Sequence, residues 1–169
     1  PSADNVLVMY AGGYGGASYT RSVATFCRAA MTLPPSFLFT FSPHPGYDPA
    51  FERAIFERVG CDDRILVAKG PSSAQIVAAS NASVSQCSTV GGQSLSITVP
   101  HVYVGPLEDS CEDVFTNANL IPQVNNAAEL AEVLTVTFRR EGYYVSEQAV
   151  IEAGVPLDGT ERAVASLLQ

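Results

Sequence analysis

The fold is decided by residues 81–104, NASVSQCSTVGGQSLSITVPHVYV. Residues 82–85 have the pattern of a short buried strand, and small polar residues follow it. Residues 101–104 predict a second buried strand, directly after Pro100. A helix between two such strands crosses over the sheet and returns the second strand parallel to the first. The stretch therefore predicts a strand, a polar turn, a helix and a parallel strand.

The helix of this unit is expected to begin at the polar turn and to end at Pro100, because a helix seldom runs past the residue before a proline. Its first N–H groups have no partner within the helix and lie at the positive end of the helix dipole. They lie at the carboxyl end of a strand, where open α/β sheets bind ligands, so we expect a phosphate there. The helix is expected to turn Leu95, Ile97 and Val99 towards the core. The candidate ligand-binding residues of this unit are Cys87, Ser88, Thr89 and Gly91.

A second candidate site lies near the start of the chain. Residues 5–10 predict a buried parallel strand, and a helix is expected over about 17–31. Glycines between the two let the backbone approach a phosphate closely. The alternative is a tight turn that only lets the helix pack on the strand. The candidate binding residues of this loop are Gly12, Gly13, Gly15 and Gly16.

The glycine loop does not fit a dinucleotide site. From Gly13, the third glycine of a G-x-G-x-x-G fingerprint falls on Ser18. The acidic residue expected after the next strand is also missing, because residues 41–44 read FSPH. NAD is therefore disfavoured, and no cofactor is expected. His44 lies between two prolines at the carboxyl end of that strand, so it is a candidate phosphate ligand, with a structural role as the alternative.

Further strands are expected at 36–41, 64–68 and 120–124, each joined to the next by a helix. Six strands alternating with helices predict an α/β three-layer sandwich around a parallel, Rossmann-like sheet. The order 3-2-1-4-5-6 would bring the glycine loop and the Ser88 turn together at the switch point. Residues 1–142 are expected to form one Rossmann-like ligand-binding domain, with C-terminal helices in 143–169 packed on it. Asp48 and Pro49 are expected to start one helix, Ser72 and Gln75 to cap another, and Asn126 and Glu129 to start a third.

The unit at 81–104 resembles the donor-binding half of GT-B-fold nucleotide-sugar enzymes, which include glycosyltransferases and non-hydrolysing UDP-N-acetylglucosamine 2-epimerases. These proteins place a Ser/Gly/Thr-rich turn after a strand, then a helix with a Glu, then Gly-x-Pro and an apolar strand. Aligned on Pro100, the family's Glu falls on Gln93 and its Gly on Thr98. The resemblance implies that Gln93 lies at the donor ribose, where the family uses a carboxylate. Glu108 is a candidate replacement for it, or else a helix-capping or surface charge.

The net charge and composition of the chain limit the kinds of partner that it can be expected to bind. The net charge of −8 argues against a nucleic-acid binder, and no apolar run is long enough to span a membrane. The four cysteines are far apart in sequence and form no CxxC pair, which favours reduced thiols and a cytoplasmic protein. Neither a DxD motif nor a cluster with metal-ligand spacing is present, so no metal is expected.

The resemblance implies the donor-binding half of a glycosyltransferase that uses UDP or a similar nucleoside diphosphate as sugar carrier. The acceptor site and catalytic base would then belong to a missing N-terminal domain or partner subunit, and the chain alone would be inactive. A homodimer contact on that side is also expected. Two alternatives stay open: a fragment of an epimerase-like enzyme, and a non-catalytic α/β module that binds a nucleotide or another subunit.

Overall fold

The computed structural model describes residues 5–105, 120–139 and 151. Its centre is a six-stranded sheet in the order β3-β2-β1-β4-β5-β6, and each neighbouring pair is parallel. The predicted strand order and α/β Rossmann-like fold are thus confirmed. The strands are β1 (Val6–Ala11), β2 (Phe37–Ser42), β3 (Ile65–Val67), β4 (Ala82–Ser85), β5 (His101–Val104) and β6 (Gln123–Val124).

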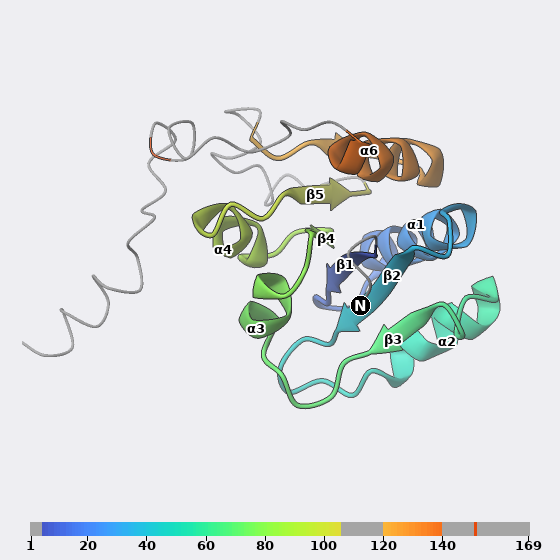
Figure 1. The fold of residues 1–169 in the computed structure, drawn as a ribbon. Helices are drawn as coiled ribbons and strands as arrows, with labels where there is room; N and C mark the ends of the chain where they lie inside the picture. Colours follow the sequence, from blue (N-terminus) through green and yellow to red (C-terminus); the bar gives the residue numbers. More distant parts are fainter. Residues whose placement is uncertain (1–4, 106–119, 140–150, 152–169) are drawn as a thin grey trace, which may run out of the picture.

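Helices cover both faces of the sheet, which gives the three layers that the sequence predicts (Figure 1). One layer contains α1, with α2 and α6 packed on either side of it, and the other contains α3 and α4. The helices are α1 (Ala17–Thr32), α2 (Ala50–Val59), α3 (Ser73–Ala78), α4 (Val90–Ser96) and α6 (Ala127–Arg139).

The expected ends of several helices are confirmed by their hydrogen bonds. Ser72 and Gln75 form the capping box that starts α3. At the start of α6, Asn126 accepts from the backbone N–H of Glu129 at 3.0 Å, and Glu129 accepts from the amide of Asn126. The helix α2 differs by one residue: Pro49 is the N-cap rather than the first helical residue, and Asp48 accepts from the N–H of Ala50 at 3.0 Å.

The end of α4 differs from the prediction. The helix stops at Ser96, four residues before Pro100, and Thr98 has a left-handed φ of 59°. Leu95 is buried as expected, whereas Ile97 is 46% exposed and Val99 only partly buried. The expectation that all three face the core was wrong for Ile97, because it lies two residues from the buried Leu95, and positions i and i+2 point to opposite sides of a helical turn.

A buried polar network joins α4 to the two strands beneath it. The ring of His101 is 1% exposed, with Nδ1 2.7 Å from Oγ of Ser83 and Nε2 2.9 Å from Oγ of Ser85. Ser83 Oγ lies 2.6 Å from Oγ of Ser94, whose hydroxyl also donates to the carbonyl of Val90. Because buried polar groups are costly when unpaired, this network ties α4 to β4 and β5 in one arrangement.

The cysteines correct one prediction. Cys27 and Cys61 are free and buried, but Cys87 is disulfide-bonded. The expectation that all four are reduced was therefore wrong, because spacing along the chain does not report which sulfur atoms meet in space. A stable disulfide does not suit a reducing compartment, so the cysteine argument for the cytoplasm no longer holds. Among the described helices, none is long and apolar enough to cross a bilayer.

Two predictions concern residues outside the described ranges. They are Glu108 as a ribose ligand and the C-terminal helices expected within residues 143–169.

Candidate functional site

The glycine loop lies at the point where the sheet's connections diverge. The strand β1 is flanked by β2 on one side and β4 on the other, so the loops after β1 and β4 meet at the carboxyl edge of the sheet. Between them is a pocket of about 200 Å³. It is lined by Ala11, Gly13, Tyr14, Gly15, Gly16 and Tyr19 of the first loop and helix, and by Gln86 and Cys87 after β4.

The start of α1 opens towards this pocket without a side-chain cap. Its N-cap is Gly16, no capping side chain among the described residues accepts from its first N–H groups, and the first turn has no acidic residue. The N–H groups of that turn are left for water or a ligand, at the positive end of a 16-residue helix. Backbone N–H groups in this position bind anions such as phosphate.

The loop glycines have different roles. A side chain at Gly12 would place Cβ 2.9 Å from the carbonyl of Ser42 and 3.0 Å from the nitrogen of His44, so Gly12 lets β1 and the end of β2 pack closely. Gly16 has φ 144°, which other residues rarely adopt. A Cβ at Gly15 would meet nothing within 4 Å, so its hydrogen atoms border open space. Gly12 therefore has the packing role of the alternative hypothesis, whereas phosphate binding at Gly15, which leaves room, stays a prediction.

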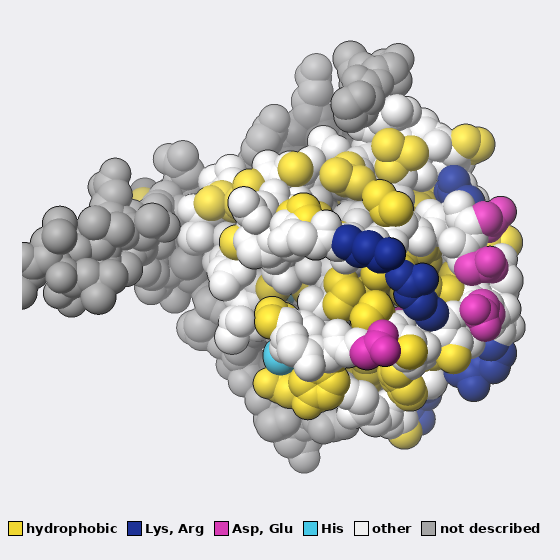
Figure 2. All heavy atoms as spheres, turned by 90° about the horizontal axis from the view of Figure 1, so that it is seen from below, with side chains coloured by type: hydrophobic (Ala, Val, Ile, Leu, Met, Phe, Trp, Pro, Cys, Tyr) yellow, Lys and Arg dark blue, Asp and Glu magenta, His cyan; other side chains and the backbone are white. Residues whose placement is uncertain are grey.

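Three rings form a cluster at the rim of the pocket. His44 lies 4.5 Å from Tyr14 and 5.4 Å from Tyr47, measured between ring centroids, and Tyr14 lies 5.7 Å from Tyr47. Tyr14 is 65% and Tyr47 57% exposed. Figure 2 shows a surface histidine bordered by hydrophobic side chains on the face that it displays. Nδ1–H of His44 donates to the carbonyl of Pro45 at 2.9 Å, which leaves Nε2 of the neutral ring as an acceptor.

Tyr19 lines the pocket, and a buried hydrogen bond holds its side chain in place. Its hydroxyl donates to Oε1 of Glu52 at 2.7 Å, and both residues are buried. Burial is the main reason that the pKa of Tyr19 is raised far above its usual value, and the same holds for Tyr10, whose hydroxyl lies 2.8 Å from Oγ of Ser22. These phenols stay neutral and act as hydrogen-bonding groups at physiological pH.

The residues after β4 separate into two groups. Cys87 lines the pocket, whereas Ser88, Thr89, Gly91 and Gln93 are not among its lining residues. Ser88 accepts from the N–H of Val90 at 3.3 Å, and Thr89 is an exposed N-cap without a side-chain hydrogen bond. Gln93 is exposed on α4.

Gly91 has a packing role. A Cβ there would lie 2.7 Å from the hydroxyl of Tyr103 and 3.2 Å from the ring of His101. His44 also does not line the pocket, and reaches it only through its contact with Tyr14. The structure thus brings the first glycine loop and Cys87 together, and leaves His44, Ser88 and Thr89 around them.

Four residues that line the pocket were not identified from the sequence: Ala11, Tyr14, Tyr19 and Gln86. Tyr14 could have been recognised in the sequence as a candidate binding residue, since a large aromatic residue between glycines has no packing function in a tight turn. Nothing in the sequence indicated Tyr19 or Gln86 as pocket residues, because the pocket forms only where the loops after the paired strands β1 and β4 meet. Among the described residues, no group of three or more His, Cys, Asp or Glu side chains could hold a metal ion.

Comparisons with known proteins support the fold. No family model matches the sequence, and no curated protein matches it either. Solved structures do match, at low sequence identity. The UDP-GlcNAc 2-epimerase from Neisseria meningitidis bound to UDP-GlcNAc has a TM-score of 0.67 at 14% identity, over 99% of this chain and 45% of that one.

Two other solved structures also match this fold at low sequence identity. Anabaena Alr3699/HepE in complex with UDP has a TM-score of 0.62 at 13% identity, over 98% of this chain and 49% of that one. The C-terminal CMP-Kdo binding domain of WaaA from Acinetobacter baumannii also has a TM-score of 0.62 at 13% identity, over 90% of this chain and 89% of that domain.

This chain therefore spans less than half of the full-length enzymes and nearly all of the isolated domain. Its six parallel strands and two helical layers have the Rossmann-like fold of one half of a GT-B enzyme.

Proposed function

We propose that the chain is the donor-binding half of a glycosyltransferase and holds the nucleoside diphosphate of an activated sugar. The observation that carries the proposal is the uncapped start of α1 behind Gly15 and Gly16, beside a pocket of about 200 Å³ at the switch point of the sheet. Diphosphate oxygens suit such a site, because it offers backbone N–H groups and a helix dipole without a metal.

Each group around the pocket has a place in this proposal. The N–H groups of the α1 start stabilise the leaving diphosphate, and the glycines let it approach. The exposed ring of Tyr14, held by His44 and Tyr47, offers a flat apolar surface to the base or the sugar. Nε2 of His44 can accept a hydrogen bond from a sugar hydroxyl.

The remaining candidate binding residues lie in the loop after β4 and in the helix that follows it. Cys87 lines the pocket, and the hydroxyls of Ser88 and Thr89 lie at the start of α4, within one or two residues of it along the chain. Gln93, on α4, stands where the family carries its ribose carboxylate, and a neutral amide can still donate and accept hydrogen bonds at a ribose. Gly12 and Gly91 act indirectly, through the packing that shapes the loops.

A second candidate function is an epimerase-like enzyme of the same architecture. It is favoured by the similarity to the Neisseria meningitidis epimerase, which extends over 99% of this chain. In either case the acceptor site or the acid and base residues would come from a second domain or subunit, since the full-length neighbours are about twice as long. A homodimer that supplies this surface is the corresponding proposal for an isolated chain.

The test is calorimetric titration of the chain with UDP, uridine and NAD, together with CDP and GDP. We expect a nucleoside diphosphate to bind, uridine to bind more weakly because it lacks phosphates, and NAD to bind least. The variant Gly15→Leu fills the open space without a clash and should abolish diphosphate binding at an unchanged melting temperature. Ala78→Leu, on the exposed side of α3, is the matched control and should bind normally. Binding of NAD alone, or equal diphosphate affinity in Gly15→Leu, would refute the proposal.

A further inference from the structure

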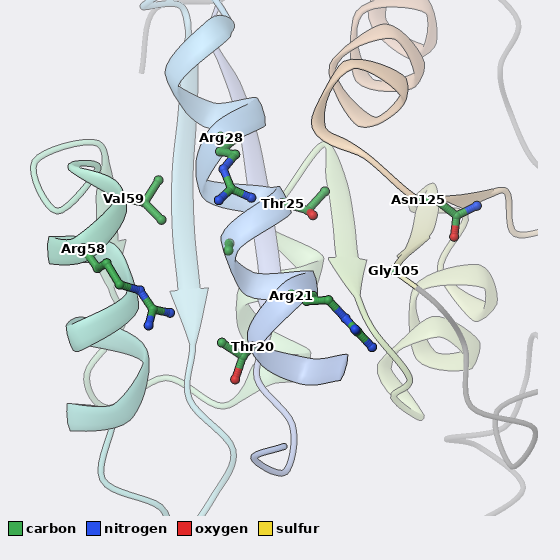
Figure 3. A pocket seen from close by; sticks show the side chains of 9 residues that line it. Thr20, Arg21, Thr25, Arg28, Arg58, Val59, Gly105 and Asn125 are labelled. Carbon is green, nitrogen blue, oxygen red and sulfur yellow. The ribbon is translucent and has the colours of Figure 1, made fainter. Parts of the chain in front are cut away.

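A second pocket, separate from the glycine loop, lies along the outer face of α1. It has a volume of about 620 Å³ and is bordered by α1, by the end of α2 and by the segments that follow β5 and β6 (Figure 3). We call it the arginine groove, after Arg21 and Arg28 of α1 and Arg58 of α2. No acidic side chain is among the described residues that line it. Thr20, Thr25 and Asn125 supply its polar groups.

The three arginines are exposed and have no carboxylate partner among the described residues. Arg21 makes one long contact, 3.3 Å from Nη2 to Oγ of Ser18. Glu129, which follows the groove residue Asn125, is occupied at the start of α6, where it accepts from the N–H of Asn125 at 2.8 Å and from the side-chain amide of Asn126.

Arg64 shows what a structural arginine looks like in this protein. It donates to the carbonyls of Ala30 at 3.0 Å and Leu33 at 3.2 Å, at the end of α1, and it lies over the ring of Phe39. The guanidinium of Arg64 is therefore already occupied by contacts within the protein. The three groove arginines have no such bonds, so their guanidinium groups are available to a ligand.

The spacing of the arginines indicates the ligand's form. Arg21 and Arg28 are seven residues apart on one helix, which places them on one face about 10.5 Å apart along the axis. In Figure 3, Arg58 extends from α2 towards α1, so the charges approach the groove from two helices. A single phosphate cannot reach all three, whereas an anion with several separated groups can. Guanidinium groups bind both phosphate and carboxylate with paired hydrogen bonds.

The charge of the whole chain limits the ligand's size. At a net charge of −8, the protein repels a long polyanion such as a nucleic acid, and three arginines do not offset that. A volume of about 620 Å³ is in the range of small-molecule sites. We propose that the arginine groove binds a small anion with two or more separated phosphate or carboxylate groups. This site does not depend on the function proposed for the glycine loop.

The test is calorimetric titration of the full chain at low ionic strength with three probes: tripolyphosphate, tricarballylate and orthophosphate. We expect one of the two multivalent probes to bind at least tenfold more tightly than orthophosphate, and which of them binds better distinguishes a phosphate from a carboxylate ligand. The affinity should fall as salt is raised, because the site is open to solvent. Weak, equal binding of all three probes would overturn the proposal.

Variants locate the site. Arg28→Gln and Arg58→Gln should each weaken binding of the better probe about tenfold, through the loss of a charge-assisted contact. Arg53→Gln is the matched control, since Arg53 is exposed on α2 but does not line the groove. Saturating UDP should leave the probe's affinity unchanged. Equal affinity in all three variants, or displacement of the probe by UDP, would show that no separate site exists.

Discussion

The hydroxyl of Tyr19 donates a 2.7 Å hydrogen bond to Oε1 of Glu52, which joins the first turn of α1 to the first turn of α2. Tyr19 also lines the pocket at the glycine loop, and Glu52 is 6% exposed. The floor of the candidate site is therefore held by a bond between two buried side chains, on helices that the sequence analysis treated separately.

Tyr19→Phe should destabilise the protein by about 1.5–3 kcal/mol, because the buried carboxylate of Glu52 loses its donor. Urea unfolding measures this free energy. A double-mutant cycle with Glu52→Leu, which removes the acceptor, separates the bond from the packing of the ring, and a coupling of about 0.5–3 kcal/mol is expected. Additive effects of the two substitutions would mean that the bond does not contribute to stability.

Stability should fall as pH rises above about 10. Burial raises the pKa values of Tyr10 and Tyr19 above those in the unfolded chain, so the folded protein keeps phenolic protons that the unfolded chain releases. This contribution is fully present below the unfolded pKa and is lost as pH rises towards the folded values. Urea unfolding between pH 8 and 11 measures the slope.

The variant Tyr10→Phe measures how much of this pH dependence of stability comes from Tyr10. It should lower stability at pH 8, because Ser22 loses its partner, and it should make the fall above pH 10 shallower. A variant curve parallel to that of the parent protein would contradict the assignment.

Gly12→Ala should destabilise the fold by about 1–3 kcal/mol, because its Cβ would meet backbone atoms at 2.9–3.0 Å. Gly13→Ala is the matched control, since its Cβ would lie 3.5 Å from the ring of Tyr19, an ordinary contact. Thermal unfolding of both variants distinguishes the packing glycine from its neighbour. A lower melting temperature for Gly13→Ala than for Gly12→Ala would reverse the two roles.

His44→Ala should weaken binding of a nucleoside diphosphate sugar about tenfold, through the loss of the Nε2 acceptor for a sugar hydroxyl and of the ring that holds Tyr14. The melting temperature should change little, because His44 lies in a loop and its own bond is to the adjacent residue. Uridine affinity, measured by calorimetry, is the control and should change less. A sharp drop in melting temperature with intact affinity for the nucleoside diphosphate sugar would make His44 a structural residue.

Most of the fold could be predicted because its signals are local. Short apolar runs, glycines after strands and proline or capping residues at helix ends act within a few residues of themselves, and they located five of the six strands to within about two residues at either end. The strand order followed from the connection rules of parallel sheets. The error at α4 is also local: Pro100 excludes a helix beyond it, but it does not require the helix to extend that far.

The candidate site could be predicted only in part. Its glycines were visible in the sequence, but Gly12 and Gly15 differ only in what surrounds them: backbone atoms at 2.9–3.0 Å in one case and open space in the other. The position of Gln86 likewise depends on which distant segments meet at the pocket.

By itself, the sequence determined the alternation of strands and helices, their parallel order and the edge of the sheet where a ligand would bind, since hydrophobic periodicity and turn chemistry act over short stretches of chain. Only the tertiary structure decided which groups share that edge, how Tyr19 is held by Glu52, and that Arg58 of α2 lines one groove with Arg21 and Arg28 of α1. These are distances between residues far apart in the chain, and they follow from the packing of whole elements rather than from any local pattern.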